Sequence, residues 1–351
     1  MGECLLVSCG ILTQHETIIE EERAAMERLL EVRDLEVRYE TVGGQVFALC
    51  EASFSVGRGE IVGVLGESGS GKSTLGVSLL AMLPGNALIE SGAVFLQGRN
   101  LVELGRRELE QIRAREVSLI FQEPSLALHP MLRVGSQIEE VLRAHGTKKK
   151  SARRREVLTL LDVIFGSEAE RIYRSYPHQL SGGQRQRIAI AQAIICKPGV
   201  LIADEPTASL DSVTQREILE LLKKLQNERG LAIVFITHAA ELLEGFADRV
   251  MVMYGGRIVE EGLAGSILRS PRHPYTQALL NCRPAFEQIE YWPKDAHLPV
   301  IQGEPPDPSG KIQGCAFVSR CPEKMPVCSE RMPDFTEMDN GGRVRCFKFG
   351  G

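Results

Sequence analysis

A glycine-rich run directly after a short apolar segment constrains the fold of this chain more than any other feature. Residues 61–65 (IVGVL) are continuously apolar, which predicts a buried strand. The run GESGSGKST follows at residues 66–74, and residues 72–83 predict a helix that stops at Pro84 and Gly85. This order of strand, glycine-rich loop and helix predicts a phosphate-binding α/β fold.

The chemistry expected of this loop follows from its residue types. Its glycines let backbone N–H groups close around phosphate oxygens at the start of a helix, whose partial positive charge favours anions. Lys72 is expected to reach the β- and γ-phosphates of a nucleotide, and the Ser73 hydroxyl to ligate Mg²⁺. The nucleotide-binding residues predicted here are Gly66, Ser68, Gly69, Gly71, Lys72, Ser73 and Thr74.

A second apolar segment ends in two carboxylates. Residues 200–203 (VLIA) predict a buried strand, and Asp204 and Glu205 follow at its carboxyl end, where α/β sheets bind ligands. Alone, such a pair would mark only the end of a strand. Beside the phosphate-binding loop, Asp204 is expected to hold Mg²⁺ and Glu205 to polarise the water that attacks the γ-phosphate.

The pentapeptide LSGGQ at residues 180–184 predicts a second phosphate site. The Ser181 hydroxyl, the amides of Gly182 and Gly183, and Gln184 lie where a helix through residue 194 is expected to begin. One chain cannot easily apply both phosphate sites to one nucleotide. The sequence therefore predicts a partner that carries a second copy of the same fold.

Together these motifs resemble those of the ATPase subunits of ATP-binding cassette (ABC) transporters, and the resemblance covers residues 30–351. It implies an α/β P-loop NTPase fold with a RecA-like core, an N-terminal antiparallel β subdomain and a helical insertion. A loop-rich, cysteine-containing C-terminal extension completes the expected architecture. The resemblance also implies that two cassettes enclose two ATP molecules with Mg²⁺, each P-loop facing the LSGGQ signature of the other cassette.

Four further positions match this family one by one. Tyr39 falls where an aromatic ring stacks on adenine, although a tyrosine there would also suit a strand core. Gln122 matches the glutamine that senses Mg²⁺ and the γ-phosphate and couples to the membrane subunit. Asp211 matches the D-loop residue that touches the opposite cassette. His238 matches the switch histidine that contacts the γ-phosphate.

Two departures from the family pattern are visible. The small residues Ala208 and Ser209 stand in swapped order, and Ala239 follows the switch histidine where Asp is usual. Neither change removes a catalytic group. We therefore expect an active ATPase whose catalytic residues are Glu205, His238 and Gln122, with Mg²⁺ held by Ser73, Gln122 and Asp204.

The C-terminal part resembles the oligopeptide/dipeptide importer ATPases. The matching segments are residues 273–280 (HPYTQALL), 303–306 (GEPP), 314–317 (GCAF) and 320–322 (RCP). In that group the cysteine tail is associated with a [4Fe–4S] cluster, for which four thiolates are required. Zinc and unliganded thiols are the alternatives, and the spacing lacks the close C-x₂-C pairs of zinc ribbons. The candidate ligands are Cys315, Cys321, Cys328 and Cys346.

The expected domain boundaries follow from these assignments. Residues 1–28 are interpreted as a poorly ordered N-terminal extension without a catalytic role. Residues 29–262 are expected to form the ABC ATPase domain, with the helical insertion at about 122–190. Residues 263–351 are expected to form the C-terminal extension of the oligopeptide/dipeptide-transporter type.

The amino-acid composition of the chain limits the classes of partner that it is expected to bind. The chain is 43% hydrophobic and 25% charged with a net charge of -5, which argues against nucleic acid as a partner. The basic run at residues 148–155 (KKKSARRR) is interpreted as a solvated loop and helix start, with a lipid-headgroup contact as the alternative. No apolar run approaches the ~18 residues of a membrane span, so the chain is not expected to cross a membrane by itself.

The predicted function is that of the ATP-hydrolysing subunit of a membrane importer, with di- or oligopeptides as the default cargo. The resemblance implies two membrane permease subunits, a second ABC ATPase subunit that is a paralogue or the same chain, and an extracytoplasmic solute-binding protein. The chain is expected to be a peripheral protein at the cytoplasmic face of the inner membrane. Import of nickel or oligosaccharides, and a soluble ABC ATPase without a transport role, are the alternatives.

Overall fold

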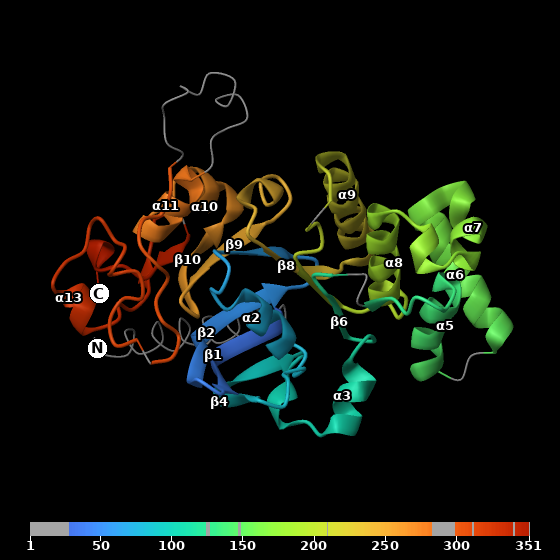
Figure 1. Ribbon diagram of the computed structural model, residues 1–351, viewed down its shortest axis with the longest axis horizontal. Helices are drawn as coiled ribbons and strands as arrows, with labels where there is room; N and C mark the ends of the chain where they lie inside the picture. The colour runs from blue at the N-terminus through green and yellow to red at the C-terminus, as the bar shows by residue number, and fades with distance from the viewer. Residues whose placement is uncertain are drawn as a thin grey trace, which may run out of the picture.

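Two β-sheets organise the computed structural model (Figure 1), which describes residues 28–123, 127–146, 149–208, 210–282, 299–310, 312–339 and 341–350. The smaller sheet is antiparallel, with the strand order β2-β1-β4-β5. Its strands are β1 (Arg28–Thr41), β2 (Gly44–Gly57), β4 (Ala87–Leu96) and β5 (Arg99–Asn100). The expected N-terminal extension lies outside the described residues except for residue 28.

The hairpin of β1 and β2 follows directly from the sequence. Apolar residues alternate along both strands, and a two-residue turn at Val42 and Gly43 joins them with Thr41 opposite Gly44. Strand β4 was not among the strands predicted from sequence. Its first half is largely exposed and its apolar burial begins only at Val94, so local alternation gives a weak signal for it.

The larger sheet has eight strands in the order β11-β12-β10-β9-β3-β8-β7-β6. Strands β9, β3, β8, β7 and β6 are parallel, and β10, β12 and β11 continue the sheet in antiparallel pairs. Their bounds are β3 (Ile61–Leu65), β6 (Val117–Ile120), β7 (Val200–Asp204), β8 (Ala232–Thr237), β9 (Arg249–Tyr254), β10 (Arg257–Leu263), β11 (Thr336–Glu337) and β12 (Arg343–Val344). Strands β3, β7 and β8 are buried throughout, because helices and the small sheet cover both faces.

The helices are spread along the described part of the chain. They are α2 (Lys72–Ser78), α3 (Arg106–Ile112), α5 (Val134–Ala144), α6 (Lys150–Phe165), α7 (Ala169–Arg174), α8 (Gly182–Ile194), α9 (Ser212–Arg229), α10 (Ala264–Arg269), α11 (Pro274–Asn281) and α13 (Val327–Glu330). Short 3₁₀ turns lie at Leu101–Glu103, Gly166–Glu168, Pro177–Gln179, Ala240–Leu242 and Phe347–Phe349. Figure 1 shows α5, α6 and α7 grouped at one end of the molecule, with α8 between this group and α9. No helix in the described ranges is long and apolar enough to cross a bilayer.

Helix α2 is shorter than the sequence predicts. We expected it to run through residue 83, but it ends at Ser78. The chain then turns back on itself: the Leu80 amide donates to the Val77 carbonyl at 3.3 Å, and Ala81 adopts a left-handed φ of 49°. The apolar residues Leu79 and Leu80 are still buried, so the periodicity that predicted a longer helix reflects this turn packing under the small sheet.

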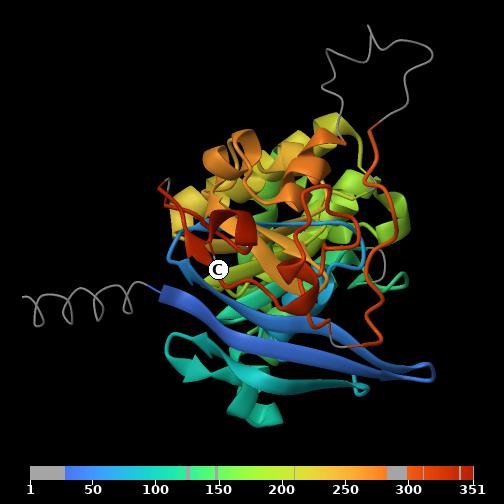
Figure 2. The ribbon, with the colours of Figure 1, turned by 90° about the vertical axis from the view of Figure 1, so that its left-hand side faces the viewer.

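The C-terminal extension is attached to the large sheet by strand pairing. Glu260 and Glu261 of β10 stand opposite Val344 and Arg343 of β12, and β11 pairs with β12 in turn. Figure 2 shows this orange-to-red part of the chain in front of the large sheet, above the blue strands of the small sheet. Apart from α13, β11, β12 and the last 3₁₀ turn, the described residues from 299 to 350 are loops.

One carboxylate joins three parts of the fold. Glu261 on β10 is buried and accepts hydrogen bonds from Arg249 on β9 and from Arg343 Nε and Nη2 on β12, the latter two at 2.9 and 2.6 Å. Arg343 Nη2 also donates to the Ser53 carbonyl of β2 at 2.8 Å. The C-terminal strand, the large sheet and the small sheet therefore meet at Glu261.

We predict that Glu261→Gln lowers the free energy of unfolding by about 2 kcal/mol. This is less than the ~3–5 kcal/mol for breaking a fully buried pair, because both arginine side chains keep 28% of their surface exposed. Thermal denaturation measures the change. Glu110→Gln is the control, since it breaks an exposed pair with Arg106 and should have almost no effect. Equal melting temperatures for both variants would contradict this role of Glu261.

Candidate nucleotide site

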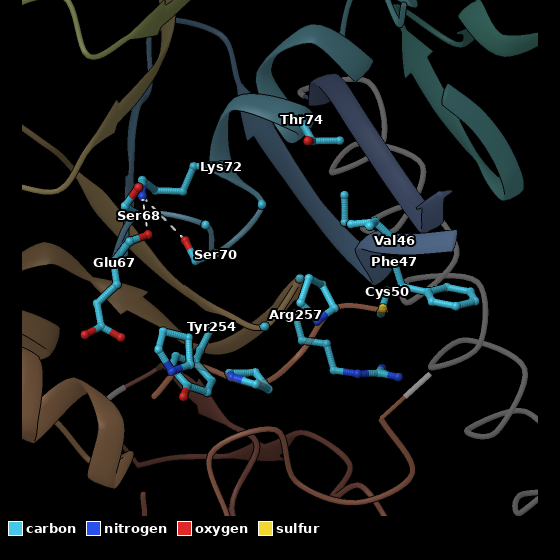
Figure 3. Close-up of a pocket in the computed structure, with 18 of the residues that line it drawn as sticks. Val46, Phe47, Cys50, Glu67, Ser68, Ser70, Lys72, Thr74, Tyr254 and Arg257 are labelled. Atoms are coloured by element: carbon cyan, nitrogen blue, oxygen red, sulfur yellow. Dashed lines mark hydrogen bonds between the residues drawn. The ribbon is translucent and has the colours of Figure 1, made fainter. Parts of the chain in front are cut away.

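The glycine-rich loop connects β3 to α2 and closes around the side chain of Lys72. Lys72 Nζ donates to the carbonyls of Gly66 and Glu67 at 2.8 and 2.7 Å and lies 3.4 Å from Ser70 Oγ (Figure 3). Burial lowers the pKa of this ammonium, and the charges of Glu205 and Asp204 oppose that shift. The loop therefore holds a buried positive charge next to two carboxylates.

Glycine is required at two positions of the loop. A Cβ on Gly71 would lie 2.4 Å from the Ala48 carbonyl oxygen, and Gly71 has a φ of 100°. A Cβ on Gly66 would lie 2.4 Å from the Met253 carbonyl oxygen. Helix α2 starts without a side-chain cap, so its first N–H groups remain available to an anion.

Asp204 ends β7 and carries a buried oxygen without a partner. Burial and the charge of Glu205 raise the pKa of Asp204, while a hydrogen bond from Ser73 and the charge of Lys72 lower it. Its Oδ1 atom makes no hydrogen bond. An unpaired carboxylate oxygen beside a serine hydroxyl is a ligand set that suits Mg²⁺, which prefers oxygen ligands. The residues present therefore fit the predicted metal.

Glu205 is held from two sides by the other predicted catalytic residues. Its Oε2 accepts from Gln122 Nε2 at 3.0 Å, and its Oε1 lies 3.0 Å from His238 Nδ1. Its backbone has a φ of 46°, a strained conformation for a residue with a side chain, and such strain concentrates at functional sites. The chain segments that follow β6, β7 and β8 thus bring Gln122, Glu205 and His238 together.

A cavity of about 530 Å³ lies next to these residues, within the usual range for ligand pockets. The P-loop, strand β2, the turn between β9 and β10 and the C-terminal extension line it, together with the side chains of Gln122 and Glu205. The lining residues outside the loop and the catalytic pair are Val46, Phe47, Ala48, Cys50, Tyr254, Gly255, Gly256, Arg257, Pro305, Pro306, Pro308, Gly310 and Ile312. Sequence analysis missed these lining residues, although GEPP at 303–306 had served as a family marker.

Tyr39 lies beside the loop but outside the cavity lining. Its hydroxyl is 3.2 Å from Thr74 Oγ1, at the start of α2. The aromatic side chains in the lining are Phe47 on β2 and Tyr254 on β9. The register of β1 shifts between Val37 and Arg38, which sequence alone does not reveal. Adenine stacking by Tyr39 stays a prediction.

The LSGGQ segment lies in a different pocket, of about 260 Å³. The Ser181 hydroxyl caps α8 by accepting from the Gln184 amide at 3.2 Å, and Gln184 Oε1 accepts from the Ser181 amide at 3.1 Å. Gly183 packs against the start of α9, because a Cβ on it would lie 2.5 Å from Thr214 Cγ2, and Gly182 lies beside Leu210 just before that helix. The structure does not bring the LSGGQ segment of this chain to its own P-loop.

Asp211 has a structural role in this chain. It caps α9 by accepting at Oδ1 from the Val213 and Thr214 amides at 3.1 and 3.0 Å, and at Oδ2 from the Thr214 hydroxyl at 2.7 Å. These hydrogen bonds lower the pKa of Asp211. Contact with an opposite cassette stays a prediction, and the neighbouring Ser209 lies outside the described residues.

The four C-terminal cysteines line one small cavity of about 20 Å³. All four are free thiols, and burial raises the pKa of Cys315 to about 11 and also raises those of Cys321 and Cys346. Among the residues that the structure describes, no group of three or more His, Cys, Asp or Glu side chains is arranged to hold a metal ion. The expected iron–sulfur cluster and its zinc alternative therefore have no formed ligand set here.

We predict that Gly71→Ala weakens ATP binding about tenfold or more. The new methyl group would meet the Ala48 carbonyl, and the left-handed backbone adds about 1–3 kcal/mol of strain. Gly85→Ala is the matched control, because a Cβ there meets no atom within 4 Å. Titration with a fluorescent ATP analogue compares the two variants, and equal affinities would rule out the P-loop as the phosphate site.

Comparison with known proteins assigns about nine tenths of the chain. Residues 49–208 match the family model for ABC transporters, and residues 259–328 match the model for the oligopeptide/dipeptide transporter C-terminal region. The chain is 40% identical to the dipeptide transport ATP-binding protein DppD of Bacillus subtilis over 323 residues, covering 92% of this chain and 95% of DppD. It is 41% identical to the oligopeptide transport ATP-binding protein OppD of Salmonella typhimurium over 321 residues, covering 91% and 93%.

Solved structures agree with this placement. The dimeric post-hydrolysis state of the ATP-binding cassette MJ0796, bound to ADP and Pi, matches with a TM-score of 0.60 and 30% identity, covering 67% of this chain and 98% of that one. The cassette cbiO1 from Clostridium perfringens matches with a TM-score of 0.60 and 27% identity, covering 76% and 98%. The predicted resemblance and fold class are confirmed. The chain belongs to the ABC transporter ATPases, in the group with an oligopeptide/dipeptide-type C-terminal region.

Proposed function

We propose that this chain is the ATP-hydrolysing subunit of a membrane importer for di- or oligopeptides. The observation that carries the ATPase part is the convergence of Gln122, Glu205 and His238 beside the P-loop. The peptide part rests on the relatives, which are named as dipeptide and oligopeptide transport ATP-binding proteins and match along almost their whole length.

The arrangement suggests a mechanism for hydrolysis. The P-loop amides and Lys72 bind the phosphates, and Ser73, Asp204 and Gln122 would hold Mg²⁺, which neutralises charge on the β- and γ-phosphates. Glu205 accepts the proton of the attacking water as the new bond to the γ-phosphorus forms and the bond to ADP breaks. The hydrogen bonds from Gln122 and His238 orient the Glu205 carboxylate for this step.

The position of the LSGGQ segment supports a dimer of two cassettes. Ser181, Gly183 and Gln184 line their own pocket, apart from the P-loop of the same chain. We infer that they face the ATP held by a second cassette, which is a paralogue or another copy of this chain, and that Asp211 lies near that contact. Tyr39 would stack on adenine at the β1 side of the P-loop.

The assembly proposed around this dimer has three further components. ATP binding would close the two cassettes head to tail. Two permease subunits would receive this closing motion near Gln122 and helices α5 to α7, and an extracytoplasmic solute-binding protein would deliver the peptide. The ATPase would then sit peripherally at the cytoplasmic face of the cell membrane. In this arrangement the ATPase chains hydrolyse ATP, and the permease chains carry the solute across the membrane.

We predict that Glu205→Gln keeps ATP binding but lowers turnover about 100-fold or more, because the amide can still bond to its neighbours but cannot accept the proton. Glu110→Gln, which alters an exposed pair with Arg106 and does not line the cavity, is the control and should hydrolyse ATP normally. Phosphate release and ATP binding are measured in parallel. Unchanged hydrolysis by the Glu205 variant would refute the assignment.

The finer proposal for the cysteine tail is a [4Fe–4S] cluster held by Cys315, Cys321, Cys328 and Cys346. Support comes from the four free thiols that share one cavity and from the number of ligands such a cluster needs. Burial disfavours the thiolate form of Cys315, whereas a bound metal stabilises thiolates. A cluster held by these thiols would cross-link the chain between residues 315 and 346.

We predict that chain purified without oxygen carries iron and acid-labile sulfide in equal amounts, about four of each. Cys328→Ser should lose both, whereas Cys196→Ser, which removes a thiol that does not line the cavity, should keep both. Iron and sulfide assays with zinc analysis read out the result. Zinc without sulfide, or no metal at all, would contradict the cluster.

A further inference from the structure

We propose that the C-terminal extension forms part of the nucleotide site itself. Residues 305–310 and Ile312 would wall the nucleoside end of the cavity, and Arg320 would position the P-loop through Glu67. The proposal rests on the proposed ATPase function and adds to it a contact with the nucleoside, made within one chain.

The first observation concerns the wall. Pro305, Pro306, Pro308 and Ile312 line the same cavity as the P-loop. The Pro308 carbonyl accepts a hydrogen bond from the Phe47 amide at 2.9 Å, so the extension is bonded to the exposed side of β2. Because the P-loop takes the phosphates, the base and sugar must lie toward the remaining walls. Those walls offer the Phe47 ring, prolines and an isoleucine, which suit the sugar and the face of the base that Tyr39 would leave uncovered.

A tight turn couples this wall to the P-loop. A Cβ on Gly255 would lie 3.0 Å from Ala316 Cβ and 3.3 Å from Pro306 Cγ, so the extension packs directly on the turn between β9 and β10. The next residue, Gly256, donates its amide to the Ser70 carbonyl of the P-loop at 3.1 Å. Its own carbonyl accepts from the Cys50 amide of β2 at 2.9 Å. Wall, turn, P-loop and β2 are therefore one bonded unit.

A buried ion pair also anchors the C-terminal extension to the P-loop. Arg320 Nη1 and Nη2 donate to the two carboxylate oxygens of Glu67 at 2.8 and 3.3 Å, and the arginine side chain is only 4% exposed. The remaining donors of Arg320 reach Tyr254 Oη at 3.2 Å and the carbonyls of Ile301 and Gln302 at 3.0 and 3.1 Å. A bidentate pair of this kind fixes orientation as well as distance.

Glu67 is also held through its backbone. Its amide donates to Tyr275 Oη of α11 at 2.8 Å, and Tyr275 packs against Tyr254 with ring centroids 4.4 Å apart. Figure 3 shows the Glu67 side chain pointing out of the loop on the side opposite to Lys72, toward the side where Tyr254 lies. The second residue of the P-loop is thus set by residues beyond the end of β10. Arg320 acts as a positioning residue, because it reaches the nucleotide only through Glu67.

The test separates wall from anchor by comparing ATP with inorganic tripolyphosphate, which has the phosphates but no nucleoside. Ile312→Ala should weaken ATP binding about fivefold and leave tripolyphosphate binding unchanged. Arg320→Met should weaken both about tenfold, because the P-loop itself is displaced. Both ligands are measured on the full chain by displacement of a fluorescent nucleotide.

Arg331→Met is the matched control, since Arg331 belongs to the extension but stacks over Phe347 and does not line the cavity. It should bind both ligands like the unaltered chain. Glu67→Gln breaks the pair from the other side and should reproduce the Arg320 effect, without further loss in the double variant. In ATPase assays the Arg320 variant should raise KM much more than it lowers kcat.

Three results would overturn the proposal. If Ile312→Ala weakened the binding of ATP and of tripolyphosphate equally, or weakened neither, the extension would not contact the nucleoside. If the Arg320→Met variant bound both ligands like the unaltered chain, Arg320 would not position the P-loop. A circular dichroism melt confirms that this variant is folded. A chain that binds ATP as described but never hydrolyses it would instead defeat the proposed ATPase function and leave this inference standing.

Discussion

The structure depends on one electrostatic arrangement: the buried ammonium of Lys72 faces the carboxylates of Asp204 and Glu205. The two carboxylates favour the charged form of the buried ammonium, and the ammonium in turn offsets part of the cost of burying Asp204. They meet because β3, β8 and β7 are neighbours in a parallel sheet, so their carboxyl ends share one edge. The sheet order is therefore what turns distant sequence motifs into one site.

The sequence predicted those parts of the site that depend on local patterns. The glycines of the P-loop, the buried strand at Ile61–Leu65 and the acidic end of β7 are each visible within a few residues. Gln122 and His238 were placed by resemblance, and the structure shows what that could not: both bond directly to Glu205. The separate pocket of LSGGQ agrees with the reasoning that one chain cannot use both phosphate sites on one nucleotide.

What the sequence could not show is set by long-range pairing. Strand β4 carries little local signal, because its burial comes from β1 beside it. The early end of α2 depends on packing that periodicity does not describe. The loops of the C-terminal extension have no regular period, so their contacts with Phe47 and Glu67, more than 250 residues away, appear only in three dimensions. The extension is joined to the cassette at Glu261 and again at Glu67.

The central claim is that this ATPase site drives a peptide importer, and capture from membranes tests it most directly. Tagged Glu205→Gln chain, held closed with Mg²⁺ and ATP, is isolated from native membranes and its companions are identified. The account predicts two polytopic membrane proteins, a second cassette ATPase and a solute-binding protein that retains a peptide. Recovery of ribosomes, DNA or a lone dimer of the ATPase would contradict it.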